Sequence, residues 1–113
     1  MRARAPSGHE VPAREPIRLD TGDEVTVGRR DTRWPEFVFV IGPLGEGWVP
    51  SRHLSADAGT AVVIIPYDTT ELELATGEEV DVLERDDTSG WWWCRRIDGA
   101  EGWVPVAALE RTA

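Results

Sequence analysis

The sequence predicts an all-β protein built as two small barrels in tandem, each of about five short strands with one 3-10 turn. Three observations support this fold class: a repeat at an offset of 55 residues, apolar–polar alternation inside each copy, and glycine or proline at the strand junctions. Repeats are examined first because a missed repeat misassigns the whole fold. A chain of 113 residues is long enough for two very small domains.

Two stretches recur in the same order and at the same spacing. "GDEVTVGRRD" at residues 22–31 aligns without gaps on "GEEVDVLERD" at 77–86, and "EGWVPSRHL" at 46–54 aligns on "EGWVPVAAL" at 101–109. We therefore expect two copies of one unit. The predicted boundaries are a flexible N-terminal tail at 1–9, a first copy at 10–55, a short linker at 56–60, a second copy at 61–110 and a tail at 111–113.

Each copy begins with two strands that have a period of two. In "ELELATGEEVDVLERDD", residues 71–87, apolar side chains alternate with acidic ones, as a half-buried strand requires. Gly77 separates these two strands, and Gly22 has the same place in the first copy.

A hairpin and a terminal turn complete each copy. Asp98 and Gly99 stand between two apolar runs, and this dipeptide accepts the positive φ angles of a tight hairpin. Pro50 and Pro105 each end a strand, because proline cannot donate a ladder hydrogen bond. The three residues that follow suit one turn of 3-10 helix. Strands this short are best stabilised as a barrel, which removes exposed edges.

The charge of the chain restricts its partners. The formal net charge is -9, and it falls unevenly, with -1 on residues 1–57 and -8 on residues 58–113. Nucleic-acid binding depends on Lys and Arg neutralising phosphates, so we expect no nucleic-acid ligand and a basic or neutral partner instead. No apolar run follows the first residues, so we expect neither a signal peptide nor a membrane segment, and a cytoplasmic protein.

Nothing in the sequence indicates catalysis. Cys94 is the only cysteine, which excludes an intrachain disulfide and a cysteine-based metal cluster, and we expect it to be a small buried thiol. Asp86 and Asp87 are adjacent carboxylates, a pattern typical of a solvated loop. No glycine-rich phosphate loop opens a helix. We therefore expect no enzyme, no metal and no cofactor.

Three stretches of the second copy together resemble an SH3 domain: "ELELATGEEVDVLERDD", "WWWCRRIDGAEGWVP" and the terminal "VAAL". The resemblance spans about residues 60–110. The first copy, with "DTRWPEFVFVIGPLGEGWVP", is similar to the bacterial variant SH3 domains, in which two units often stand in tandem. The resemblance implies a non-enzymatic module that binds a proline-containing or basic peptide in the polyproline II conformation along an aromatic groove.

The resemblance also implies a set of groove residues. Pro105 falls on the groove proline, and Tyr67 on the second tyrosine of the family's aromatic motif. The candidates for an acidic specificity pocket are Asp68, Glu71, Asp86 and Asp87. In the first copy, Trp34 and Pro50 are the corresponding candidates.

The groove tryptophan has two candidates. Counting back from Gly102 gives Trp92, whereas counting forward from Gly90 gives Trp91. Both stay open, because neighbouring strand residues face opposite sides and a slip of one residue exchanges their roles.

The sequence departs from the family pattern at several groove positions. Ile65 stands near the place of the first motif tyrosine, and the loop between Tyr67 and Glu71 is several residues shorter than usual. The tyrosine expected after the closing proline is Ala108 in the second copy and His53 in the first.

The six tryptophans divide into two groups. We expect Trp48 and Trp103, at equivalent positions, to complete the small cores. Alternation prevents residues 91–93 from all being buried on one face, so at least one tryptophan is exposed or covered by a peptide or by the other repeat. The alternative to peptide binding is therefore a structural or self-associating domain, with a homodimer as one form of it.

Overall fold

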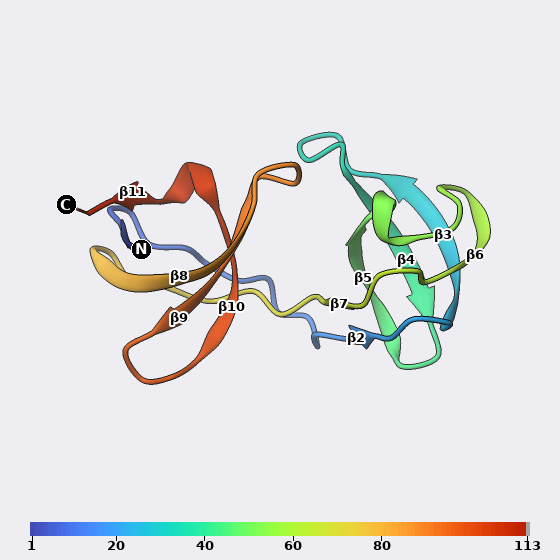
Figure 1. Cartoon of the computed structure of the whole chain (residues 1–113), viewed down its shortest axis with the longest axis horizontal. Coiled ribbons are helices and arrows are strands. Elements are labelled where there is room, and N and C mark those ends of the chain that lie inside the picture. Colours follow the sequence, from blue (N-terminus) through green and yellow to red (C-terminus); the bar gives the residue numbers. More distant parts are fainter. Residues whose placement is uncertain (113) are drawn as a thin grey trace. The chain divides into compact units, whose positions relative to one another are not determined.

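The computed structural model describes residues 1–112, and the fold is all-β with almost no helix (Figure 1). The strands are β1 (Arg2–Ala5), β2 (Arg18–Leu19), β3 (Glu24–Arg30), β4 (Phe37–Gly42), β5 (Gly45–Pro50), β6 (Gly59–Val62), β7 (Tyr67–Asp68), β8 (Glu78–Asp86), β9 (Trp91–Arg96), β10 (Glu101–Pro105) and β11 (Glu110–Arg111). Two 3-10 turns, η1 (Ser51–His53) and η2 (Val106–Ala108), follow the strand-ending prolines as predicted.

The chain divides into two compact units. Unit 1 combines Met1–Arg14 with the chain from Thr70 onward, and unit 2 is the continuous stretch Glu15–Thr69. Unit 1 contains an antiparallel sheet in the order β10-β9-β8-β1-β11, and unit 2 contains the sheet β5-β4-β3-β6 and the short pair β2-β7. In sequence terms, unit 2 is inserted into unit 1.

The predicted tail at residues 1–9 is instead part of the sheet of unit 1. Strand β1 pairs with β8 on one side and β11 on the other, so the blue N-terminal segment lies between them in Figure 1. Ala3 and Ala5 are fully buried while Arg2 and Arg4 are exposed. The segment thus has the alternation of a strand, but two alanines give a much weaker apolar signal than valine or leucine does.

The predicted linker and the start of the second copy likewise lie in unit 2. Strand β6 pairs with β3, with Ala61 opposite Val25, and strand β7 pairs with β2. The predicted boundary between copies at 56–60 therefore differs from the boundaries of the two units, which fall after Arg14 and after Thr69.

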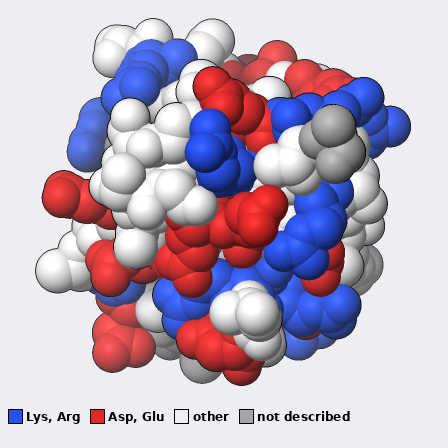
Figure 2. Space-filling view, turned by 90° about the vertical axis from the view of Figure 1, so that its left-hand side faces the viewer, with Lys and Arg blue, Asp and Glu red and all other residues white. Residues whose placement is uncertain are grey.

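The two units carry nearly equal charge, unlike the two halves of the sequence. Unit 1 has twelve acidic and seven basic residues, a net of -5, and unit 2 has nine and five, a net of -4. The first fourteen residues, which carry three arginines, belong to the acidic second half. On the face in Figure 2, acidic and basic side chains are mixed, consistent with the exposed pairs Arg2–Asp81 and Arg4–Glu110.

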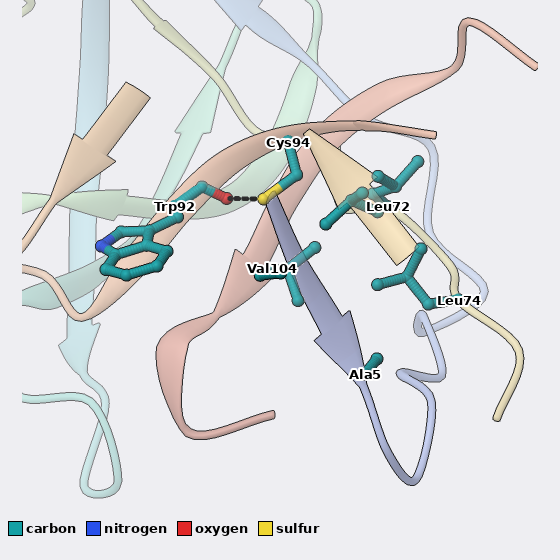
Figure 3. Packing of buried hydrophobic residues seen from close by; sticks show 8 residues of the cluster. Ala5, Leu72, Leu74, Trp92, Cys94 and Val104 are labelled. Carbon is teal, nitrogen blue, oxygen red and sulfur yellow. Dashed lines mark hydrogen bonds between the residues drawn. The ribbon is translucent and has the colours of Figure 1, made fainter. Parts of the chain in front are cut away.

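The core of unit 1 forms around the inward side of β9. Cys94 is fully buried among Leu72 and Val104, and its thiol donates to the Trp92 carbonyl at 3.5 Å (Figure 3). Burial raises the pKa of the Cys94 thiol to about 12. In unit 2, the equivalent inward positions of β4 are Val38 and Val40, both buried.

The β9–β10 hairpin closes as its sequence predicts. Gly99 has a φ of 92°, in the left-handed region that favours glycine. Asp98 accepts hydrogen bonds from the Arg96 guanidinium and the Ala100 N–H. The hydrogen bond from Arg96 holds the pKa of the Asp98 carboxyl below its usual range.

Gly102 allows a second chain segment to lie against β10. The Trp103 N–H donates to the Thr70 carbonyl at 2.9 Å, and the Leu72 N–H donates to the Trp103 carbonyl at 3.0 Å. A Cβ atom at Gly102 would lie 2.7 Å from the Leu72 nitrogen and 2.8 Å from the Glu71 carbonyl carbon. Both are backbone atoms, so a methyl group would force the two segments apart.

We therefore predict that Gly102→Ala lowers the free energy of unfolding by about 1–3 kcal/mol, the usual cost of overpacking. The control is Gly47→Ala at the equivalent position of unit 2, where a Cβ would meet only the Thr69 side chain at 3.4 Å. That change should stay within about 1 kcal/mol. Urea unfolding followed by tryptophan fluorescence measures both, and equal effects would contradict the close approach at Gly102.

The burial of Cys94 gives a second prediction. With a pKa of about 12, its thiolate is scarce at pH 8, and the thiolate is the reactive form. Ellman's reagent should modify the folded protein about 1000-fold more slowly than the protein in denaturant, since the pKa of an unfolded cysteine is about three units lower. Modification at the same rate in both conditions would place the thiol at the surface.

Candidate functional site

The three consecutive tryptophans of β9 divide between two faces. Trp92 and Cys94 are buried, whereas Trp91 and Trp93 are half-buried, as the alternation of a strand requires. The Trp92 indole Nε1 donates to the Asp87 carboxylate at 2.9 Å. Trp92 therefore belongs to the scaffold, and Trp91 is the candidate for the groove tryptophan.

Trp91 lies among residues from three separate segments. In the β9–β10 register it is opposite Pro105, so the two side chains share a face of the sheet. The His9 ring meets the Trp91 ring edge-on, with 5.8 Å between ring centroids and 74° between ring planes. The His9 Nε2 donates to the Glu71 carboxylate at 3.1 Å. We call Trp91, Pro105, His9 and Glu71 the Trp91 site.

Sequence reasoning missed His9, because it placed this residue in a flexible tail. In the structure His9 is bound to Leu74 by two backbone hydrogen bonds, from the His9 N–H at 2.8 Å and from the Leu74 N–H at 2.9 Å. The alternation at Ala3 and Ala5, if taken as a strand, would have indicated that residues near position 9 continue an ordered segment.

The predicted acidic residues of the β8–β9 loop have structural contacts. The Asp86 carboxylate accepts from the Ser89 N–H at 3.2 Å, and the Asp86 carbonyl accepts from the Gly90 N–H at 2.9 Å. Asp87 holds the Trp92 indole. These contacts fix the loop that leads into Trp91, and they leave Glu71 as the carboxylate of the Trp91 site.

The ten predicted site residues divide between the two units. Unit 1 contains Glu71, Asp86, Asp87, Trp91, Trp92 and Pro105, and unit 2 contains Trp34, Pro50, Tyr67 and Asp68. Tyr67 and Asp68 therefore do not join Trp91 in one unit.

In unit 2, Tyr67 packs against His53. Their rings are 5.1 Å apart between centroids and 81° between planes, and the His53 Nδ1 donates to the Ile65 carbonyl at 3.1 Å. Phe37 lies opposite Pro50, the position that Trp91 has relative to Pro105 in unit 1. Trp34 is half-buried, and its carbonyl accepts from the Phe37 N–H at 2.9 Å.

The expectation that Trp48 and Trp103 are structural agrees with their packing. Trp103 meets Trp93 edge-on and Trp48 meets Phe39 edge-on, both with 5.2 Å between ring centroids. The Trp93 indole also donates to Glu101 at 2.8 Å. These equivalent cross-strand pairs stabilise the same place in both sheets.

Over residues 1–112 there is no group of three or more His, Cys, Asp or Glu side chains that could hold a metal ion. In the same part of the chain, no helix has the length and apolar character needed to cross a membrane.

Comparison with known proteins identifies the second copy. Residues 64–111 match the variant SH3 domain family. The SH3 and PX domain-containing protein 2A of Danio rerio is 30% identical over 79 residues, which cover 62% of this chain and 7% of the relative. The SH3 domain-containing protein Dlish of Drosophila melanogaster is 36% identical over 55 residues, which cover 46% of this chain and 15% of the relative.

Myosin-1 of Yarrowia lipolytica is 44% identical over 41 residues, covering 35% of this chain and 3% of the relative. The chain thus spans only a small part of the length of these curated relatives. No solved structure matches the chain significantly. The chain belongs to the SH3 family through residues 64–111, which carry the variant SH3 domain sequence.

Proposed function

We propose that unit 1 is a non-enzymatic interaction module that binds an extended, proline-containing peptide segment with an Arg or Lys. SH3 domains generally mediate protein–protein interactions, and the finer assignment rests on one observation. Trp91 keeps part of its surface open on the face that it shares with Pro105, beside the carboxylate of Glu71.

The chemistry of the Trp91 site suits such a ligand. A polyproline II segment is already extended and has no internal hydrogen bonds, so it loses little entropy when proline rings pack on an indole face. The edge-on contact with His9 restricts the Trp91 ring, which lowers the cost of ordering it when a peptide binds.

The charge of unit 1 favours a basic residue in the ligand. Glu71 is partly exposed beside Trp91, and the unit carries a net charge of -5. A guanidinium can approach the free lone pairs of the Glu71 carboxylate while His9 keeps its hydrogen bond. The same charge disfavours nucleic acid and anionic membranes. A cytoplasmic location is part of this proposal, because the single cysteine is free and buried.

The first test is the change Trp91→Ala, with Trp93→Ala as the matched control on the same face of β9. The probe is a ten-residue peptide with one Arg followed by Pro-x-x-Pro, titrated by isothermal calorimetry and by NMR of the indole N–H signals. Loss of Trp91 should weaken binding by about tenfold or more, as expected of a central aromatic contact, whereas Trp93→Ala should change it little. Circular dichroism confirms that both variants fold.

No heat and no shift at millimolar peptide would overturn the proposal. If sedimentation then showed a concentration-dependent dimer that Trp91→Ala dissolves, the tryptophan surface would be a self-association site, which is the alternative function.

A second test addresses Glu71. The change Glu71→Gln removes the charge but keeps an oxygen that can accept from His9. It should weaken the Arg-containing peptide by about threefold to tenfold and leave an Arg→Ala peptide unaffected, and salt should reduce this difference. Glu73→Gln, the same change on an exposed residue two positions on, is the control. Equal losses for both variants would show that only the total charge matters.

A further inference from the structure

The sheets of the two units are closed by equivalent strands from different parts of the chain. Val25 and Val80 are equivalent at the offset of 55 residues. In unit 2 the partner of Val25 is Ala61 on β6, and in unit 1 the partner of Val80 is Ala3 on β1. Ala3 and Ala61 therefore have the same structural position, and both are buried.

The equivalence continues along both segments. The Gly77 N–H donates to Ala5 at 2.7 Å, and the equivalent Gly22 N–H donates to Val63 at 2.8 Å. Farther along, His9 pairs with Leu74, and Tyr67 pairs with Leu19, 55 residues before Leu74. Residues 2–9 and 60–67 are thus the same segment of the repeat, which we call the closing segment.

Each closing segment completes the body of the other repeat. Residues 2–9 precede the first body, 18–55, but close the second, and residues 60–67 precede the second body, 71–111, but close the first. The variant SH3 match at residues 64–111 runs without interruption through Tyr67 into the second body. The structure, however, assigns residues 64–69 to unit 2.

We propose that the two closing segments are interchangeable, so that residues 60–67 can also close the second body and residues 2–9 the first. The exposed side of the pairing tolerates either arrangement. Arg4 faces Glu79 in the structure, and in the other arrangement it would face Glu24, the equivalent residue. On the buried side the two alanines match, and the difference is Ala5 against Val63.

The short connection between Tyr67 and the second body determines which arrangement is the resting one. Thr70 and Leu72 are both hydrogen-bonded to Trp103, so only Asp68 and Thr69 remain to reverse the chain. A connection this short favours exchange over return to its own body. The ion pairs of Arg2 with Asp81 and of Arg4 with Glu110 also favour the exchanged arrangement, modestly, because they are exposed.

The choice of closing segment decides which ring stands beside Trp91. In the exchanged arrangement that ring is His9, whereas the alternative would bring Tyr67 and Asp68 to the same place. Interchange would therefore alter the aromatic and acidic groups of the Trp91 site. This consequence for ligand choice rests on the proposed function, but the interchange itself does not.

Engineered disulfides test the interchange in the full chain, with Cys94→Ala to remove the native thiol. Facing Cα atoms in antiparallel strands lie within disulfide range. The pair Arg4→Cys and Glu79→Cys reports the exchanged arrangement, and the pair Val62→Cys and Glu79→Cys reports the alternative. Each pair is also made in a chain with six Gly and Ser residues inserted between Asp68 and Thr69. Peptide mapping by mass spectrometry identifies the disulfides after mild oxidation.

In the unaltered loop we expect the Arg4–Glu79 cysteine pair to oxidise as the major product. In the lengthened loop we expect the Val62–Glu79 cysteine pair to become a major product. A Val62–Glu79 disulfide between two copies would also support the proposal, because a second copy would then supply the closing segment.

The control is Val62→Cys with Glu24→Cys, the partners in the structure, which shows that the thiol at position 62 can react. If this pair oxidises in the lengthened chain and the Val62–Glu79 cysteine pair never does, the segments are not interchangeable. Failure of the Arg4–Glu79 cysteine pair in the unaltered loop would overturn the exchange itself. Neither result depends on peptide binding, so it is separate from the test of the proposed function.

Discussion

The fold depends on the pairing of one short closing strand with the long second strand of each repeat. Without β1, the β8 edge of unit 1 would be left with unpaired backbone groups, and β11 would have no neighbour, because β1 lies between them. Strand β6 covers the corresponding edge of β3 in unit 2. The inward alanines allow these strands to approach the core closely, so the same few residues both satisfy the backbone and close the apolar interior.

The tryptophans have different tasks because the strand period separates them. Trp92 points inward and is held by Asp87, while Trp93 and Trp103 form an edge-on pair across two strands. Trp91 is left at the end of β9, beside a proline and a histidine that come from distant parts of the sequence. Three consecutive tryptophans thus supply a core, a cross-strand contact and an open aromatic surface.

The acidic charge acts on the site more than on the fold. The two units carry similar net charges, and the printed ion pairs involving Arg2, Arg4 and Arg30 are exposed, so they contribute little to stability. Glu71 is different because it is partly buried, hydrogen-bonded to His9 and next to Trp91. A carboxylate in this position gives the aromatic surface a preference for a cationic ligand.

The sequence alone determined the all-β class, the repeat and its strand order, the Asp98–Gly99 hairpin, the 3-10 turns after Pro50 and Pro105, and the SH3 resemblance. These features are local or repeat at a fixed spacing, so the order of residues is sufficient. Only the tertiary structure decided that Trp92 faces inward, because a slip of one residue reverses a strand. It also decided that His9 rather than Tyr67 lies beside Trp91. Both closing segments have the pattern that either body accepts, and only the complete chain, with its short connection at Asp68 and Thr69, distinguishes them.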